Sequence, residues 1–325
     1  MSRVLVTGGT GFLATHLIVA LLRAGRPVRT TLRSPTSESD LRAAVRRGGA
    51  DDTPLECVIA DLTSDDGWPA AVAGCEEVHH VASPIPTREP DDPDELIVPA
   101  REGTLRVLRA AIDAGARRTV LTSSFAAVRY TAEPTTEFTE EHWTDPDTPG
   151  LSAYARSKAI AERAAWELTD RHGTTELTVL NPTFVFGPPL SPDVRSSLRL
   201  LKAMLDGTTT LLPRQRFGVV DVRDVADLHL RAMAAPNAAG RRYLAVADGP
   251  TLTHVDLAEI LRRLGPLASR VPTRQEPGED PPPLVIRNTR ARTDLAWNPR
   301  PAETTIIQTI EGMRALEMLP PDPQS

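Results

Sequence analysis

The stretch RVLVTGGTGFLATHL, residues 3–17, constrains the fold more than any other part of this 325-residue chain. A short apolar run is followed by glycines and then by apolar residues at helical spacing, which predicts a strand, a tight turn and a helix. Gly9, Gly11 and Ala14 satisfy the pattern G-x-G-x-x-G/A. Its glycines allow the turn and the approach of the backbone to a pyrophosphate, and its third position lets the helix pack on the strand. We therefore expect a βαβ unit that binds a dinucleotide at the N-terminus of its helix.

The first 180 residues continue this alternation of strands and helices. Further strands are expected at 27–32, 55–60, 76–81, 117–122 and 175–180, and helices at 39–47, 94–114 and 152–172. Such alternation predicts an α/β fold, a Rossmann-type doubly wound parallel sheet covered by helices on both faces. We expect a cofactor-binding Rossmann domain at 1–180 with a return segment at 215–240. A smaller substrate-binding cap is expected from 181–214 and 241–325.

Composition and charge exclude several kinds of partner. The net charge is −6 and no basic stripe is present, so nucleic acid is not an expected partner. The apolar run 17–22 is too short to cross a bilayer, and we expect neither a signal peptide nor a membrane contact. Cys57 and Cys75 match no metal or disulfide spacing. We expect a cytoplasmic protein without metal that is a monomer or a homodimer and acts on a small molecule.

The residues after the second expected strand indicate which dinucleotide binds. An NAD site places an acid there, about twenty residues after the glycines, to hold the 2′-hydroxyl of the ribose. This chain reads TTLRSPTS instead, and the first acid after the strand is Glu38. Arg33 and Ser34 can hold a 2′-phosphate by charge and hydrogen bonding, so the expected cofactor is NADPH/NADP⁺. The alternative for Arg33 is an ordinary solvated arginine.

Two further segments supply the residues for a carbonyl reaction. The apolar strand in RRTVLTSS ends at Ser123 and Ser124, and ligands of open α/β sheets bind at the carboxyl ends of strands. Tyr154 and Lys158 are four residues apart and share one face of the expected helix 152–172. A phenol is a poor acid at neutral pH, and a nearby ammonium makes it a better one by stabilising the phenolate. A serine can then hold a carbonyl oxygen, the tyrosine can protonate it, and a nicotinamide can supply the hydride.

With these motifs the chain resembles the extended short-chain dehydrogenase/reductases of the NAD(P)-dependent epimerase/dehydratase superfamily. It is most similar to the branch of dihydroflavonol reductases, cinnamoyl-CoA reductases and microbial carbonyl reductases. The resemblance covers nearly the whole length and is carried by VTGGTGFLATHL, VRTTLRS, ADL, HVASP, TSS, YARSK and NPTFVFGP. It implies an oxidoreductase that reduces an aldehyde or ketone to an alcohol with NADPH, the proton coming from Tyr154.

The resemblance also implies roles for individual residues. Ser124, the second serine of TSS, Tyr154 and Lys158 would be catalytic, and Lys158 would also bind the nicotinamide ribose. The implied cofactor contacts are Gly8, Gly11, Phe12, Leu13, Arg33, Ser34, Asp61, Leu62, Val81, Ala82, Ser83, Tyr154, Lys158, Pro182, Thr183, Val185 and Ser197. The implied substrate contacts are Ser83, Pro84, Ser124 and Arg129.

Arg129 departs from the family pattern. Plant dihydroflavonol reductases have a specificity residue, often asparagine, five positions after the catalytic serine, and here that position holds Arg129. The difference argues against a flavonoid substrate. Arg129 either faces the substrate or points to solvent.

Two other functions remain open for such a sequence. A nucleotide-sugar epimerase or dehydratase, or a 3β-hydroxysteroid-type dehydrogenase, would more often use NAD, and Arg33 argues against that cofactor. A non-catalytic NADP-sensing protein of the same fold would be expected to lose Tyr154 or Lys158, and both are present.

Arg33→Ala is expected to weaken NADPH binding far more than NADH binding. A charge-assisted hydrogen bond is worth about 1.5–3 kcal/mol, which is roughly one to two decades in affinity. Titration of the protein with each cofactor gives the two dissociation constants. An equal loss of affinity for both cofactors would remove the assignment of Arg33 to the 2′-phosphate.

Overall fold

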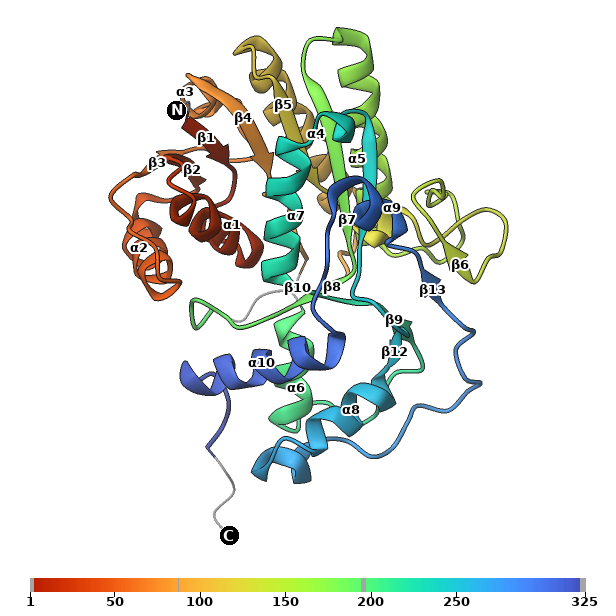
Figure 1. Cartoon of the computed structure of the whole chain (residues 1–325). Coiled ribbons are helices and arrows are strands. Elements are labelled where there is room, and N and C mark those ends of the chain that lie inside the picture. The colour runs from red at the N-terminus through yellow and green to blue at the C-terminus, as the bar shows by residue number, and fades with distance from the viewer. Residues whose placement is uncertain (1–2, 87, 194–196, 322–325) are drawn as a thin grey trace.

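A seven-stranded parallel sheet forms the centre of the computed structural model, which describes residues 3–86, 88–193 and 197–321 (Figure 1). Its strands are β1 (Arg3–Val6), β2 (Val28–Leu32), β3 (Leu55–Ile59), β4 (Cys75–His80), β5 (Arg118–Thr122), β7 (Glu176–Pro182) and β11 (Arg241–Ala245). They lie in the order β3-β2-β1-β4-β5-β7-β11, and each neighbouring pair is parallel. The strand order reverses between β1 and β4, which is where ligands bind in doubly wound sheets.

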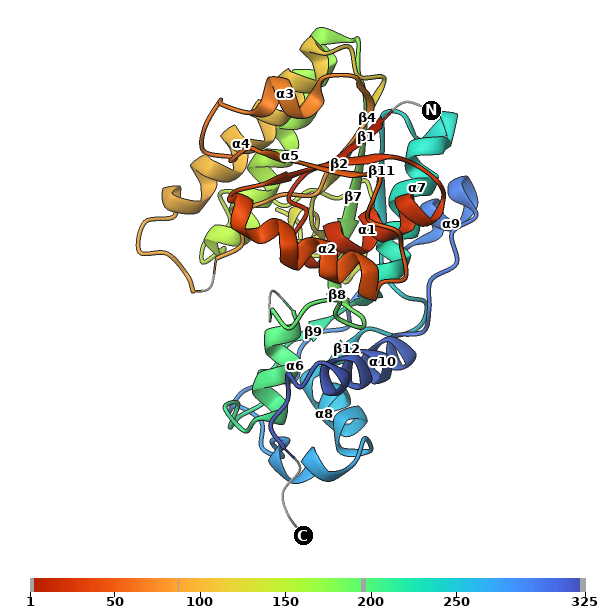
Figure 2. The ribbon, with the colours of Figure 1, turned by 90° about the vertical axis from the view of Figure 1, so that its left-hand side faces the viewer.

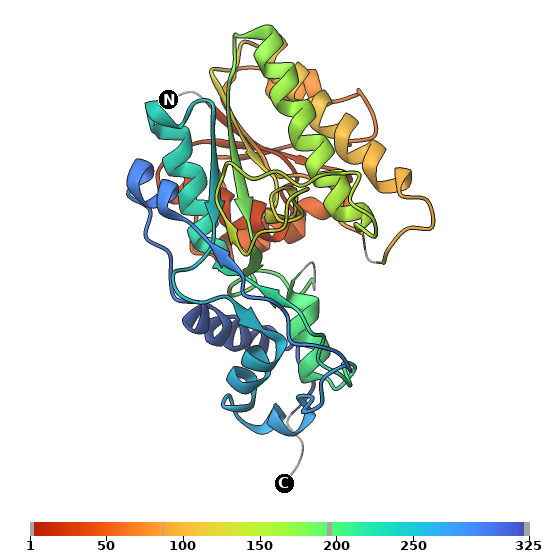
Figure 3. The ribbon, with the colours of Figure 1, turned by 90° about the vertical axis from the view of Figure 1, so that its right-hand side faces the viewer.

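Helices cover both faces of this sheet. The helices are α1 (Phe12–Arg23), α2 (Glu38–Arg47) and α7 (Val222–Ala234) on one face, and α3 (Trp68–Val72), α4 (Asp94–Asp113) and α5 (Ala153–His172) on the other. Figures 2 and 3 show α4 and α5 on one side of the sheet and α7 on the opposite side. The expected doubly wound fold is confirmed, and the strands and helices expected in the first 180 residues lie within two residues of those observed.

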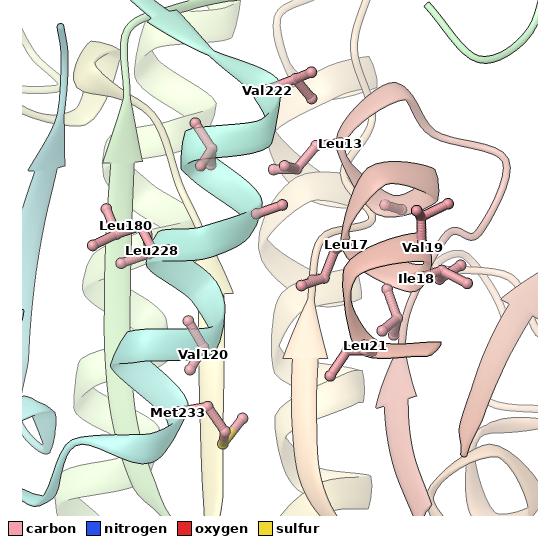
Figure 4. Close-up of a cluster of buried hydrophobic side chains, with 14 of the residues drawn as sticks. Leu13, Leu17, Ile18, Val19, Leu21, Val120, Leu180, Val222, Leu228 and Met233 are labelled. Carbon is pink, nitrogen blue, oxygen red and sulfur yellow. The ribbon is translucent and has the colours of Figure 1, made fainter. Parts of the chain in front are cut away.

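The largest cluster of buried apolar side chains lies between α1, α7 and the sheet. Leu13, Leu17 and Leu21 are spaced four apart on α1 and project toward α7 (Figure 4). Leu228 and Met233 of α7 are buried in the same cluster. Because this stripe fixes α1 against the sheet, it also fixes the helix N-terminus beside the glycine turn.

A smaller cap lies beyond the end of β7. Its helices are α6 (Leu198–Leu205), α8 (His254–Arg262) and α10 (Ala302–Ala315), which share a separate apolar cluster. Short strands pair in and beside it: β8 (Phe184–Phe186) with β10 (Val219–Asp221), β9 (Arg216–Phe217) with β12 (Leu252–Thr253), and β6 (Glu137–Phe138) with β13 (Val285–Ile286). Figure 1 shows the cap below the sheet, on the side where β7 continues into β8.

The chain returns from the cap to the sheet through α7 and β11. β11 forms the edge strand of the main sheet, although the expected division assigned 241–325 to the smaller part. The helix α9 (Thr289–Leu295) packs against α7 and β11 before the chain leaves again for α10. Within the described ranges, none of the helices combines the length and the apolar character that a membrane span requires.

Candidate active site

The turn between β1 and α1 presents bare backbone toward the crevice. Gly9 N donates to Thr31 O at 3.0 Å, and Gly8 N donates to Thr31 Oγ1 at 2.9 Å. A Cβ at Gly9 would lie 2.4 Å from Thr30 Oγ1, and one at Gly8, where φ is +73°, would lie 2.9 Å from Ala82 Cβ. The first turn of α1 contains no acid and no side chain caps its N-terminus, and the first N–H groups of a helix generally lack intrahelical partners. This cradle fits the pyrophosphate of a dinucleotide.

Most of the predicted cofactor residues share one edge of the sheet. They follow its strands in turn: Gly8, Gly11, Phe12 and Leu13 after β1; Arg33 and Ser34 after β2; Asp61 and Leu62 after β3; Val81, Ala82 and Ser83 after β4; Pro182, Thr183 and Val185 at and after the end of β7. Because the strands are parallel, their carboxyl ends meet at the same edge and bring these distant segments together.

Arg33 and Arg106 bring positive charge to the part of this edge that follows β2 and β3. Arg33 directly follows β2 and is exposed, and Ser34 Oγ accepts from Thr36 N at 3.3 Å. Hydrogen bonds from Thr63 hold the pKa of Asp61 below its ordinary value, and the charges of Arg33 and Arg106 add to this effect. Arg33 therefore lies close enough to Asp61 for their charges to interact, with its donors free to meet an anion.

A side-chain network fixes the segment after β4. Thr7 Oγ1 accepts hydrogen bonds from Val81 N at 3.0 Å and Ala82 N at 2.9 Å, and it lies 2.9 Å from His80 Nδ1. With both lone pairs occupied, the hydroxyl donates its proton to His80 Nδ1, so the histidine carries its proton on Nε2. Burial lowers the pKa of His80 to about 3, and the charge of Lys158 acts in the same direction. Neither Thr7 nor His80 is assigned to the site from the sequence.

Lys158 lies between the segment after β4 and the phenol of Tyr154. Its Nζ donates to Ser83 Oγ at 2.8 Å and lies 5.6 Å from the centre of the Tyr154 ring. Ser152 caps α5 by accepting from Ala155 N at 3.2 Å, and this start of the helix sets the face on which both residues stand. Lys158 is buried and Tyr154 is half-buried. The ammonium and the phenol ring therefore stand near each other at the carboxyl edge of the sheet.

The two serines after β5 differ in their surroundings. Ser123 is buried, and its Oγ donates to Glu162 Oε2 at 2.6 Å. Ser124 is half-buried, and its Oγ accepts from Ala126 N at 3.1 Å. The hydroxyl proton of Ser123 is therefore committed to Glu162, whereas Ser124 keeps a proton that can be donated to a substrate. This geometry favours Ser124 as the serine that meets the substrate.

Behind the serines, Glu162 forms the centre of a buried polar network. Its Oε2 also accepts from Asn181 Nδ2 at 2.7 Å, and its Oε1 accepts from Arg242 Nε at 2.6 Å. Asn181 Nδ2 lies 3.1 Å from the carbonyl oxygen of Ser124 and donates to it as well. Glu162, Asn181 and Arg242 are not assigned to the site from the sequence. Only the spacing of Glu162 could have pointed to it, because it follows Lys158 by four residues on the same helix face.

A small cavity joins these groups. It is lined by Ala82, Ser83, Thr104, Ser123, Lys158 and Glu162 among others. The lysine, the segment after β4 and the network behind the serines therefore line one small cavity between β4, β5, α4 and α5.

Two of the predicted residues, Ser197 and Arg129, lie on the side of the cap. Ser197 precedes α6, and its Oγ donates to Val185 O. Arg129 is half-buried, and its Nη1 donates to Arg216 O of β9 at 3.1 Å, so its guanidinium turns toward the cap rather than to bulk solvent. Pro84 is half-buried in the loop after Ser83.

The model of the NAD dependent epimerase/dehydratase family matches residues 4–245. This chain belongs to the NAD dependent epimerase/dehydratase family. Among its relatives, cinnamoyl-CoA reductase CAD2 of Medicago truncatula is 32% identical over 317 residues, which cover 96% of this chain and 95% of the relative. Tetraketide alpha-pyrone reductase 2 of Arabidopsis thaliana is 37% identical over 248 residues, which cover 74% and 77%.

Solved structures agree with this family membership. The yeast methylglyoxal/isovaleraldehyde reductase Gre2 complexed with NADPH superposes with a TM-score of 0.82 at 27% identity, over 97% of this chain and 99% of Gre2. Vestitone reductase from alfalfa has the same fold, with a TM-score of 0.78. The chain is therefore an enzyme of the NAD(P)-dependent reductases within the epimerase/dehydratase family.

Arg242→Met is expected to lower the free energy of unfolding by about 3–5 kcal/mol, because it leaves the charge of Glu162 buried without its partner. The double variant Glu162→Leu/Arg242→Met should recover part of this loss, since neither charge is then left alone. Urea unfolding of each variant measures the effect. Arg241→Met, at the exposed neighbouring position of β11, is the matched control. A loss in Arg242→Met no larger than in this control would contradict the role of the pair.

Proposed function

We propose that this protein reduces an aldehyde or a ketone to the alcohol, with NADPH as hydride donor and Tyr154 as proton donor. The observation that carries the proposal is the placement of the buried Lys158 ammonium, 5.6 Å from the centre of the Tyr154 ring and 2.8 Å from Ser83 Oγ. Ser124 completes the set, because its hydroxyl proton is not committed to Glu162.

The cofactor of this enzyme is NADPH/NADP⁺. Gre2, which is similar over nearly the whole chain, is complexed with NADPH. In this chain the position after β2 carries the exposed Arg33 instead of an acid. The turn at Gly8 and Gly9 has no room for side chains, because an added Cβ would meet Ala82 or Thr30.

The residues of the site divide the reaction between them. When bound, the nicotinamide supplies the hydride to the carbonyl carbon. Ser124 donates a hydrogen bond to the carbonyl oxygen, and Tyr154 transfers its phenolic proton to that oxygen as negative charge develops there. Lys158 stabilises the phenolate that remains, and Ser83 holds the ammonium in place. Hydride and proton together convert the carbonyl group to the alcohol.

The proposed division of labour follows the architecture. The Rossmann domain at 1–180, with the return segment 215–240, would hold the cofactor, and β11 of the sheet would extend this part to residue 245. The cap, formed mainly from 181–214 and the rest of the C-terminal part, would bind the substrate. The substrate would lie between them, against Ser83, Pro84, Ser124 and Arg129.

Arg129 bears on the class of substrate. It stands five residues after Ser124, and one of its five N–H donors is given to Arg216 O. The remaining donors suit a carboxylate or an ester oxygen, which argues for substrates such as keto esters. A planar neutral flavonoid would leave this charge without a partner.

Arg129→Ala is expected to slow the reduction of keto acids and keto esters more than that of neutral ketones of the same size, because the guanidinium loses its oxygen partner. Relative kcat/KM values over such matched substrate pairs measure the effect. Arg129→Lys, which keeps the charge, should retain more of the preference than Arg129→Ala. Unchanged relative rates in Arg129→Ala would rule out this role.

Tyr154→Phe is expected to lower turnover by about 10²–10⁴-fold, the usual contribution of a positioned acid. Its affinity for NADPH should stay near wild type, because the ring and its packing remain. Turnover on a carbonyl panel and NADPH titration measure the two properties. Tyr130→Phe, at an exposed tyrosine, is the matched control and should keep full turnover.

Two companion variants separate the roles within the set. Lys158→Met should damage both turnover and cofactor binding, since the ammonium would serve the phenol and the ribose. Ser124→Ala should mainly lower turnover, because it removes one hydrogen bond to the carbonyl oxygen. Near-normal turnover of Tyr154→Phe on a good carbonyl substrate would contradict the mechanism.

A further inference from the structure

A short proline-containing segment, Gly187–Leu190, connects the cofactor domain with the cap; it is called the Pro-Pro segment below. It follows β8, and in Figure 1 the green chain at this point runs between α1 above and α10 below. None of its residues belongs to the predicted cofactor or substrate contacts. Its own contacts nevertheless reach both parts of the molecule.

Two side chains of the cofactor domain hold the Pro-Pro segment from one side. His16 of α1 donates from Nε2 to Pro188 O at 3.0 Å. Burial lowers the pKa of His16 to about 4, so the ring is neutral at pH 7 and its single proton is the one in this bond. Arg47, at the end of α2, donates to Leu190 O. These anchors come from residues 172 and 143 positions away in the sequence.

The cap holds the same segment from the other side. Gly187 N donates to Thr309 Oγ1 of α10 at 2.8 Å, and this bond is buried. A Cβ at Gly312 would lie 3.0 Å from Pro188 Cα and 2.9 Å from Pro189 Cδ, so α10 packs directly on the two prolines. A displacement of the Pro-Pro segment would therefore also displace α10.

The Pro-Pro segment also forms a wall of the phosphate cradle. One cavity is lined by Thr10, Phe12 and Thr15 of the glycine turn and α1, and on the other side by Pro189, Leu190, Ser191 and Asp193. The side of this cavity formed by α1 is the helix N-terminus that receives the negative charge of a dinucleotide. The opposite side is the segment anchored by His16 and Arg47.

We propose that His16 and Arg47 are positioning residues for the bound dinucleotide, which hold the Pro-Pro segment as the second wall of the phosphate site. Because α10 packs on the same segment, cofactor binding also restrains the cap before a carbonyl substrate arrives. The inference rests on the proposed use of NADPH and extends it to residues that touch neither the nicotinamide nor the substrate.

The test measures NADPH release in the absence of a carbonyl compound. Dissociation is followed by the loss of NADPH fluorescence enhancement after displacement by excess NADP⁺ in a stopped-flow instrument. His16→Leu should release NADPH roughly tenfold faster, the effect of about one lost hydrogen bond. His16→Gln should release NADPH at nearly the wild-type rate, because the side-chain amide of glutamine can donate a hydrogen bond from about the position of Nε2.

Neighbouring arginines on α2 supply a matched pair. Arg47→Leu should accelerate NADPH release several-fold. Arg46→Leu should not, because Arg46 is equally exposed but pairs with Asp52, at 2.8 Å, instead of the Pro-Pro segment. Equal release rates in Arg46→Leu and Arg47→Leu would overturn the proposal.

Hydrogen exchange reports the link to the cap independently of catalysis. NADPH should slow amide exchange in α10 of the wild-type protein, and this protection should be largely lost in His16→Leu while the glycine turn stays protected. Wild-type release rates in both His16→Leu and Arg47→Leu, with unchanged unfolding midpoints, would overturn the inference. A wild-type protein that binds NADPH but reduces no carbonyl compound would overturn the proposed function instead and leave the comparison of release rates valid.

Discussion

The buried carboxylate of Glu162 joins three neighbouring strands of the sheet, and the geometry of the site depends on this junction. Ser123 and Asn181 donate to one oxygen and Arg242 donates to the other, so β5, β7 and β11 are tied together from α5. The side chains of Glu162 and Arg242 are 0% and 7% exposed, which makes the loss of either partner costly. Lys158 stands one turn before Glu162 on the same helix. Glu162, which accepts the hydroxyl proton of Ser123, therefore also helps to place Lys158 on α5. The hydroxyl proton of Ser124 is left available for a substrate.

The sheet could be predicted from the sequence because its signals are local. Apolar periodicity and the glycine turn after β1 each lie within a short window, and alternation of strands and helices leads to a parallel sheet. Parallel strands then place their carboxyl ends at one edge of the sheet. The segments that follow the strands could therefore be expected at this edge without knowledge of their side-chain contacts. The proposed catalytic set rests on local signals of the same kind, since Tyr154 and Lys158 share a helix face and the serines end a strand.

The supporting network could not be predicted in the same way. Glu162 meets partners 19, 39 and 80 positions away, and Thr7 meets His80 at a separation of 73. Such pairs leave no periodic signal, because each residue alone reads as an ordinary polar side chain near a strand end. The choice between Ser123 and Ser124 came from family resemblance alone. The structure adds a physical reason, which is that only one of the two hydroxyl protons already has a partner.

The cap depends on the sheet for its own assembly. The chain leaves the sheet after β7, returns through α7 and β11, and leaves again for α8 and α10, so the apolar cluster of the cap is built from separated stretches. Contacts that reach across the junction from the cofactor domain include the bond of Arg129 to β9 and the bonds of His16 and Arg47 to the segment on which α10 packs. The first lies beside the proposed substrate site, and the other two lie beside the phosphate cradle. A movement of the cap relative to the sheet would strain these bonds, so we expect the position of the cap to affect both substrate access and cofactor release.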